Sequence, residues 1–284
     1  MKIWPAVRHM TGLDRTGVPL RGWAALELSL MWLVWGLALG MLCWASGFDV
    51  ALQRALYASR CEWFDQIVRT VSSLGLGRTL IFVVFTAGCV MGLRTVRPGR
   101  RFLFLLRLLW GCVAQLGLWA RGRFVWTAAW QLLCPMARGL LMIVPGLAVS
   151  GLLQLMLKAS IGRPRPKMIL WEGASPYALS PIWESGFNAR YMSFPSGHSC
   201  STWLVCTILM HVWPRWAGPI FAFGVVVSAT RFLAVTPHYL GDVVAGAGVG
   251  GAVGLALVRL MGVGVSSEKQ GAKQGAERGV GHED

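Results

Sequence analysis

The chain has 284 residues, of which 55% are hydrophobic and only 14% are charged, and its mean hydropathy is +0.55. Soluble domains usually contain about 25% charged residues, so this composition excludes an ordinary soluble domain and indicates an integral membrane protein. The formal net charge of +15 is spread over the segments between apolar runs rather than gathered on one soluble face. We therefore interpret the cations as topology determinants and contacts to lipid headgroups, and we expect no nucleic acid as a partner.

Six apolar runs are candidates for membrane-spanning helices, which need about 17 to 25 residues each. They lie at about residues 24–46, 79–93, 137–157, 198–213, 218–233 and 239–261. The sequence thus predicts an all-α, polytopic membrane helical bundle with about six transmembrane helices. The apolar stretch 102–119 contains Arg107 and Gln115 and is flanked by arginines. We favour an interfacial helix there over a further span, which would put the termini on opposite sides of the membrane.

The ends of the chain differ from its middle. Residues 1–22 form a basic N-terminal segment, residues 23–262 a membrane domain with motifs between residues 158 and 242, and residues 263–284 a tail. Gly, Lys, Glu and Gln are abundant in the tail, so we predict that it is disordered. The first apolar run is too long for a cleaved signal peptide and is typical of an uncleaved signal anchor. The positive-inside rule makes both terminal segments cytoplasmic and puts the motif-bearing loops on the opposite side.

Seven cysteines are scattered along the chain without a CxxC pair, and most of them lie inside apolar runs. We expect them to be buried small hydrophobic residues. The sequence therefore predicts neither a disulfide framework nor a metal site.

The first motif follows the third apolar run, which ends at Lys158 and is broken by the segment 162–166, Gly-Arg-Pro-Arg-Pro. A proline after each arginine favours an extended backbone there, so Arg163 and Arg165 are expected to point away from the bilayer. Two guanidinium groups and one ammonium group would then face one site and bind phosphate oxygens. The alternative is an ordinary positively charged end of a membrane helix.

The second motif is the segment 193–198, Ser-Phe-Pro-Ser-Gly-His, which runs directly into the next apolar helix. This helix is predicted to start near Ser199. Free backbone N–H groups at a helix start, close approach at Gly197 and the hydroxyl group of Ser196 together favour an anion site. His198 would lie beside the bound anion. The alternative is a helix-capping turn with an incidental histidine.

The third motif opens the last apolar run. Thr236 can cap the helix and Pro237 can take its first position, which puts His238 in the first turn. Asp242 lies one turn later on the same face, where it can accept the imidazole N–H and leave the other ring nitrogen free to attack. Arg231, at the end of the fifth run, is a further candidate phosphate ligand. The alternative is a surface His–Asp pair.

In this order, the three motifs resemble the signature of the type 2 phosphatidic acid phosphatase superfamily, over roughly residues 62–260. The resemblance implies that His238 is a nucleophile that forms a phosphohistidine, that Asp242 orients it, and that His198 protonates the leaving group. It also implies that the phosphate is held, without a metal ion or other cofactor, by Lys158, Arg165, Ser196, the amide of Gly197 and Arg231. Two departures are present: Thr230 replaces the usual serine, and the six residues 232–237 are one more than the usual spacing.

The expected function is hydrolysis of a lipid phosphate or diphosphate by a membrane phosphatase. Undecaprenyl diphosphate, lipid A, phosphatidylglycerol phosphate and phosphatidate are all candidate substrates, and membrane lipids are the expected partners. The family resemblance implies a bacterial inner membrane location with the active site facing the periplasm. Two alternatives remain open: a lipid phosphotransferase that uses the same phosphohistidine, and a non-catalytic lipid-binding protein.

The last apolar run is rich in glycine, with Gly246, Gly250 and Gly254 four residues apart. This spacing places small residues on one helix face and favours close helix packing in a tight bundle. The alternative is a flexible face toward lipid.

Overall fold

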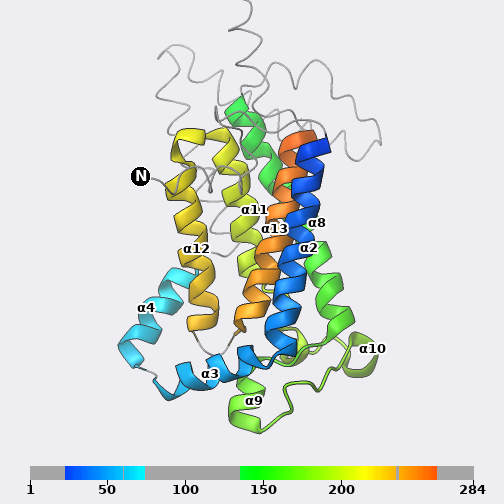
Figure 1. Ribbon diagram of the computed structural model, residues 1–284, viewed down its shortest axis with the longest axis vertical. Helices are drawn as coiled ribbons and strands as arrows, with labels where there is room; N and C mark the ends of the chain where they lie inside the picture. Colours follow the sequence, from blue (N-terminus) through cyan, green and yellow to red (C-terminus); the bar gives the residue numbers. More distant parts are fainter. Residues whose placement is uncertain (1–22, 60, 74–134, 235–236, 261–284) are drawn as a thin grey trace, which may run out of the picture.

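The computed structural model describes residues 23–59, 61–73, 135–234 and 237–260, and every regular element in those ranges is a helix. Long helices run side by side along the molecule (Figure 1): α2 (Trp23–Ala45), α8 (Pro135–Ile161), α11 (Gly197–Val212), α12 (Ala217–Leu233) and α13 (Leu240–Leu260). Short helices gather at the end where α2 and α8 finish: α3 (Phe48–Ala58), α4 (Glu62–Ser73), α9 (Pro166–Glu172) and α10 (Ile182–Ser185). Two 3-10 turns complete the set, η2 (Ala189–Tyr191) and η3 (Pro214–Trp216). The predicted all-α fold is confirmed.

Within the described ranges, four helical segments are long and apolar enough to cross a membrane: Glu27–Ala45, Leu141–Glu172, Pro214–Leu233 and Leu240–Arg259. They correspond to four of the six predicted runs. The run predicted at 198–213 forms α11, whose 16 residues make it shorter than these segments. The run 79–93 and the stretch 102–119 lie outside the described residues. The structure supports a membrane protein, and the number of six spans stays a prediction.

Large apolar side chains cover the outer faces of α2 and α8. The exposed ones include Leu30, Met31, Val34, Trp35, Val144, Leu152 and Met156. A soluble monomer rarely exposes so continuous an apolar surface, whereas a surface in contact with lipid tails is expected to be apolar. These faces are therefore consistent with the assignment of α2 and α8 as spans.

Helix α13 lies between α2 and α11, and glycines allow close contact on both sides. A Cβ atom built on Gly250 would lie 2.0 Å from the carbonyl oxygen of Cys200 in α11. One built on Gly248 would lie 2.7 Å from Cα of Gly36 in α2. No side chain fits at these contacts, so the prediction of close packing through glycine is confirmed.

The three motifs come together at one end of the bundle. Helices α8 and α12 end there and α11 and α13 begin there, next to α3 and α9 (Figure 1). The start of α2 and the end of α13 lie at the opposite end. The topology therefore separates the motifs from the helix ends that lead to the chain termini.

Candidate functional site

Three predicted phosphate ligands occupy helix ends at this site. Lys158 is buried in the last turn of α8, and its Nζ donates a hydrogen bond to the carbonyl of Met192 at 3.1 Å. Arg165 precedes α9, and its Nε donates to the carbonyl of Ala189 at 2.8 Å. Arg231, in the last turn of α12, donates to the hydroxyl group of Ser72 in α4. These contacts fix the three side chains that bring positive charge to the site.

The second motif forms the expected start of α11. Ser196 is the N-cap residue and is fully buried, and its backbone N–H donates to the carbonyl of Asp242 at 2.8 Å. Its hydroxyl group has no hydrogen-bond partner among the described residues, and neither has Nε of Arg231. Gly197 opens the helix, and a Cβ atom there would lie 2.9 Å from the side-chain oxygen of Gln154. The start of α11 thus offers backbone N–H groups and an unpaired hydroxyl group.

His238 lies before α13, not in its first turn as predicted, because α13 begins at Leu240. The reason is Asp242, the third residue of the helix, whose Oδ2 accepts the backbone N–H of Tyr239 at 3.0 Å and so caps the helix there. The proposed cap Thr236 lies outside the described residues.

The imidazole of His238 has a closer partner than the one that was predicted. Nδ1 lies 2.9 Å from the carbonyl oxygen of Ser193 and 3.6 Å from Oδ2 of Asp242. A carbonyl oxygen only accepts, so Nδ1 carries the proton and Nε2 is the basic nitrogen of the neutral ring. Asp242 remains close, but the backbone of the second motif fixes the tautomer.

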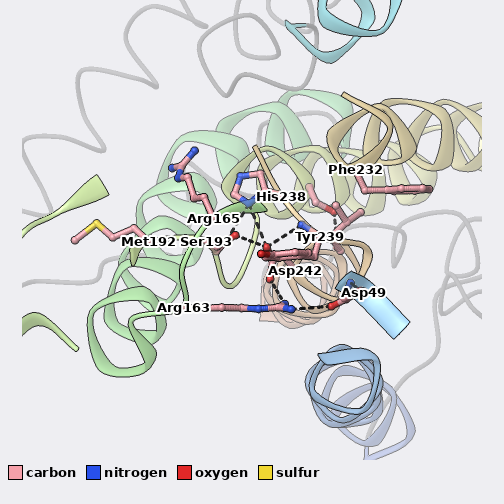
Figure 2. A network of polar contacts seen from close by, with 12 residues as sticks. Asp49, Arg163, Arg165, Met192, Ser193, Phe232, His238, Tyr239 and Asp242 are labelled. Carbon is pink, nitrogen blue, oxygen red and sulfur yellow. Dashed lines mark hydrogen bonds and ion pairs between the residues drawn. The ribbon is translucent and has the colours of Figure 1, made fainter. Parts of the chain in front are cut away.

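Asp242 is fully buried at the centre of a polar network that Figure 2 shows. Its Oδ1 accepts from Nη1 of Arg163 at 2.6 Å, and its Oδ2 also accepts from the hydroxyl group of Ser193. Nη2 of Arg163 donates to Oδ2 of Asp49 in α3 at 3.0 Å. The guanidinium group of Arg163 also lies 4.0 Å from the ring centroid of Tyr239. The expectation that Arg163 faces the phosphate site beside Arg165 is therefore wrong.

The roles of Asp49, Arg163 and Ser193 in this network were missed from the sequence. A usable signal was Asp49 itself, an acid placed directly after an apolar run, because a buried carboxylate needs a partner. Nothing in the sequence identified that partner as Arg163, 114 positions away.

Burial lowers the pKa of His238 to about 3, although the nearby carboxylate of Asp242 acts in the opposite direction. Lys158 and Arg231 lower it further by charge repulsion. The ring is therefore neutral near pH 7, as a nucleophile must be. Over the described residues, no group of three or more His, Cys, Asp or Glu side chains is placed to hold a metal ion.

Comparison with known proteins gives the family of this region. The PAP2 superfamily matches residues 139–264. We call residues 139–264 the PAP2 region. This PAP2 region contains every predicted site residue, whereas Asp49 and Ser72 lie outside it. The resemblance inferred from the three motifs is confirmed for this part of the chain.

Two curated relatives are lipid A 1-phosphatases from Rhizobium etli and Rhizobium johnstonii. Each is 36% identical to the chain, over 102 and 101 residues respectively, which is 36% of this chain. The matches cover 41% and 39% of the two relatives, so the chain spans about two-fifths of their length. A solved structure, a transmembrane PAP2 type phosphatidylglycerolphosphate phosphatase from Bacillus subtilis, is 16% identical, with a TM-score of 0.49 over 81% of this chain and 93% of that one.

Proposed function

We propose that this protein is a membrane phosphatase that hydrolyses the phosphate ester or diphosphate of a lipid through a phosphohistidine. The observation that carries the proposal is the neutral, oriented His238 at the bundle end where the cations and the start of α11 also lie. Phosphoryl transfer needs positioning and charge stabilisation more than any other catalytic effect. The site offers both, together with a nucleophile.

The phosphate is bound by residues that are charged or that have free hydrogen-bond donors. Lys158, Arg165 and Arg231 neutralise the phosphate charge, and a guanidinium group can bind two oxygens at once. The buried hydroxyl group of Ser196 and Nε of Arg231 have no other partner among the described residues, so phosphate oxygens would satisfy them. The amide of Gly197 adds a donor at the start of α11.

In the first step Nε2 of His238 attacks phosphorus and the bond between phosphorus and the leaving oxygen breaks. His198 gives its proton to that oxygen, and the lipid leaves as an alcohol, or as a phosphate when the substrate is a diphosphate. Burial disfavours a charged His198, and so do nearby Arg231, Lys158 and Arg165, in that order. The bound phosphate reverses this effect, because its negative charge stabilises the protonated ring.

In the second step water attacks the phosphohistidine and His198 takes a proton from that water. The bond between Nε2 and phosphorus breaks, and inorganic phosphate leaves. Throughout, Asp242 and the carbonyl of Ser193 hold the Nδ1 side of the ring and stabilise the positive charge that develops on it.

Lipid A is the first substrate to test, because both curated relatives are named lipid A 1-phosphatases. Undecaprenyl diphosphate, phosphatidylglycerol phosphate and phosphatidate are the other candidates. We place the protein in the bacterial inner membrane, and the basic N-terminal segment and tail support a site that faces the periplasm.

The test is release of inorganic phosphate by the purified full chain in detergent with EDTA, from each of the four lipids. We expect release from one lipid and a loss of at least about a thousandfold in His238→Ala, because the covalent step then has no nucleophile. Undiminished release by the folded variant would contradict the mechanism. Label from the substrate that appears on an acceptor lipid, not in solution, would indicate phosphate transfer.

A further inference from the structure

Helix α3 turns two buried polar side chains toward the site. Asp49 and Gln53 are 0% and 1% exposed, although most of the other residues of this 11-residue helix are exposed or half-buried. They lie four positions apart, so they occupy one face of α3 in successive turns. Neither belongs to the PAP2 region or to any of the three motifs.

Gln53 bridges the two sides of the connection between α12 and α13. Its Nε2 donates to the carbonyl of Phe232 at 3.1 Å and to the carbonyl of His238 at 3.0 Å. Six residues, 232–237, separate Arg231 from His238 in this connection. The ordering of a connection costs conformational entropy, and the two hydrogen bonds hold its ends, Phe232 and His238, at fixed positions.

Asp49 fixes the start of α13 from the same helix. Its Oδ1 accepts the backbone N–H of Gly241 at 2.9 Å, and its Oδ2 accepts Nη2 of Arg163 at 3.0 Å. Arg163 in turn holds Asp242, as Figure 2 shows. A Cβ atom on Gly241 would lie 2.6 Å from Oδ2 of Asp49, so glycine is needed for this approach.

We infer that α3 is a positioning element in which Gln53, supported by Asp49, holds His238 where its Nε2 can attack phosphorus. This inference rests on the proposed function, because it assigns a supporting role to the same histidine. Among the described residues, no hydrogen bond joins Asp49 or Gln53 to the proposed phosphate ligands. A displacement of a reacting group by about 1 Å can cost on the order of a hundredfold in rate, so a backbone anchor beside the nucleophile matters for catalysis.

The test compares Gln53→Met with Arg54→Gln in the full-length protein, using the lipid that the wild type hydrolyses fastest. Methionine keeps the volume of the buried side chain but cannot donate to the two carbonyl groups. Arg54 is the next residue of α3 and is exposed, so its variant is a matched control. We expect kcat of Gln53→Met to fall at least about tenfold while KM stays within about twofold, because the cations that bind phosphate are untouched.

A second readout separates positioning from general loosening of the structure. Orthovanadate mimics the transition state when it forms a bond with the attacking nitrogen. Inorganic phosphate needs only the cations in order to bind. We expect the inhibition constant for orthovanadate to rise at least about tenfold in Gln53→Met and that for inorganic phosphate to stay within about twofold. Equal weakening of both inhibitors would overturn the positioning role.

Should Gln53→Met not fold, Asp49→Asn replaces it, since asparagine can still accept from Gly241 but loses the charge that faces Arg163. The same split between kcat and KM is expected. This inference alone would be overturned if the wild type is active, His238→Ala is inactive and the α3 variants keep the wild-type kcat. A wild type that releases no phosphate from any lipid would contradict the proposed function, and the inference with it.

Discussion

At the residue scale, Arg163 joins two carboxylates from distant parts of the chain, Asp49 and Asp242. It is 1% exposed and lies between the rings of Trp44 and Tyr239, 4.8 Å and 4.0 Å from their centroids. A charge in such a position is tolerated only when it is paired, so each member of the network depends on the others.

Replacing Arg163 should therefore affect stability more than replacing Arg165. Arg163→Met leaves two buried carboxylates without their cation, and we expect the free energy of unfolding to fall by about 3–5 kcal/mol. The half-buried Arg165 hydrogen-bonds a single carbonyl group, so Arg165→Met should lower phosphatase activity with a smaller loss of stability. Denaturant titration in detergent measures the first quantity and phosphate release the second. Equal stability losses in the two variants would contradict the assignment of Arg163 to the buried network.

The low pKa of His238 gives a pH dependence of stability. In the unfolded chain this histidine binds a proton near pH 6.5, whereas the folded chain resists protonation down to about pH 3. Between these values the unfolded state holds more protons, so stability falls as the pH falls. The loss from pH 7 to pH 5 should be about 2 kcal/mol greater in the wild type than in His238→Asn. If the free energy of unfolding falls equally with pH in the two proteins, the buried neutral ring is contradicted.

The sequence predicted which residues gather at the candidate site better than it predicted the partner of each residue. All predicted phosphate ligands lie at the motif end of the bundle, because the apolar runs fixed where the helices stop. The separate roles of Arg163 and Arg165 were not predictable, since both precede a proline and the difference depends on Asp49. The partner of Nδ1 in His238 was also missed, because a backbone carbonyl leaves no signal in a sequence.

At the element scale, α13 combines packing and chemistry. Its glycines contact α2 and α11, and its first turn carries Asp242. The spacing of glycines predicted a close contact, but the partner on each side could be known only from the fold. Since α11 begins at the proposed anion site and α13 begins beside His238, the distance between the two helices sets the geometry of the candidate site.

Gly250→Ala should separate these helices. The added Cβ atom would lie 2.0 Å from a backbone oxygen, which cannot move away as a flexible side chain could. We expect the free energy of unfolding to fall by about 1–3 kcal/mol and the phosphatase activity to decrease. Gly151→Ala is the matched control, because a Cβ atom there meets nothing within 4 Å and alanine favours a helix. Similar unfolding curves for the two variants would contradict the tight contact between α11 and α13.

At the scale of the whole molecule, all three motifs lie at one end of a bundle whose outer faces are apolar. The side of the membrane on which this end lies was predicted from the distribution of cations. The cationic loops at the motif end depart from the positive-inside rule, and phosphate binding gives several of those cations another reason to be there.

Cys61 provides a reporter of this sidedness. Contrary to the expectation that the cysteines are buried, it is exposed, and it lies between α3 and α4 at the motif end. If this end faces the periplasm, a thiol reagent that cannot cross the inner membrane should label the wild type in intact cells. The signal should be weaker in Cys61→Ser. Labelling of Cys61 only after the inner membrane is opened would place the site in the cytoplasm.

The origin of Asp49 and Gln53 outside the PAP2 region has a consequence for protein engineering. A fragment that starts at residue 139 would keep every motif residue, yet it would remove one of the two carboxylates that bind Arg163 and both hydrogen bonds of Gln53. A chimera that joined this PAP2 region to the N-terminal helices of a relative would have to restore those contacts. The smallest unit that can be transplanted between proteins is thus larger than the region in which the family is recognised.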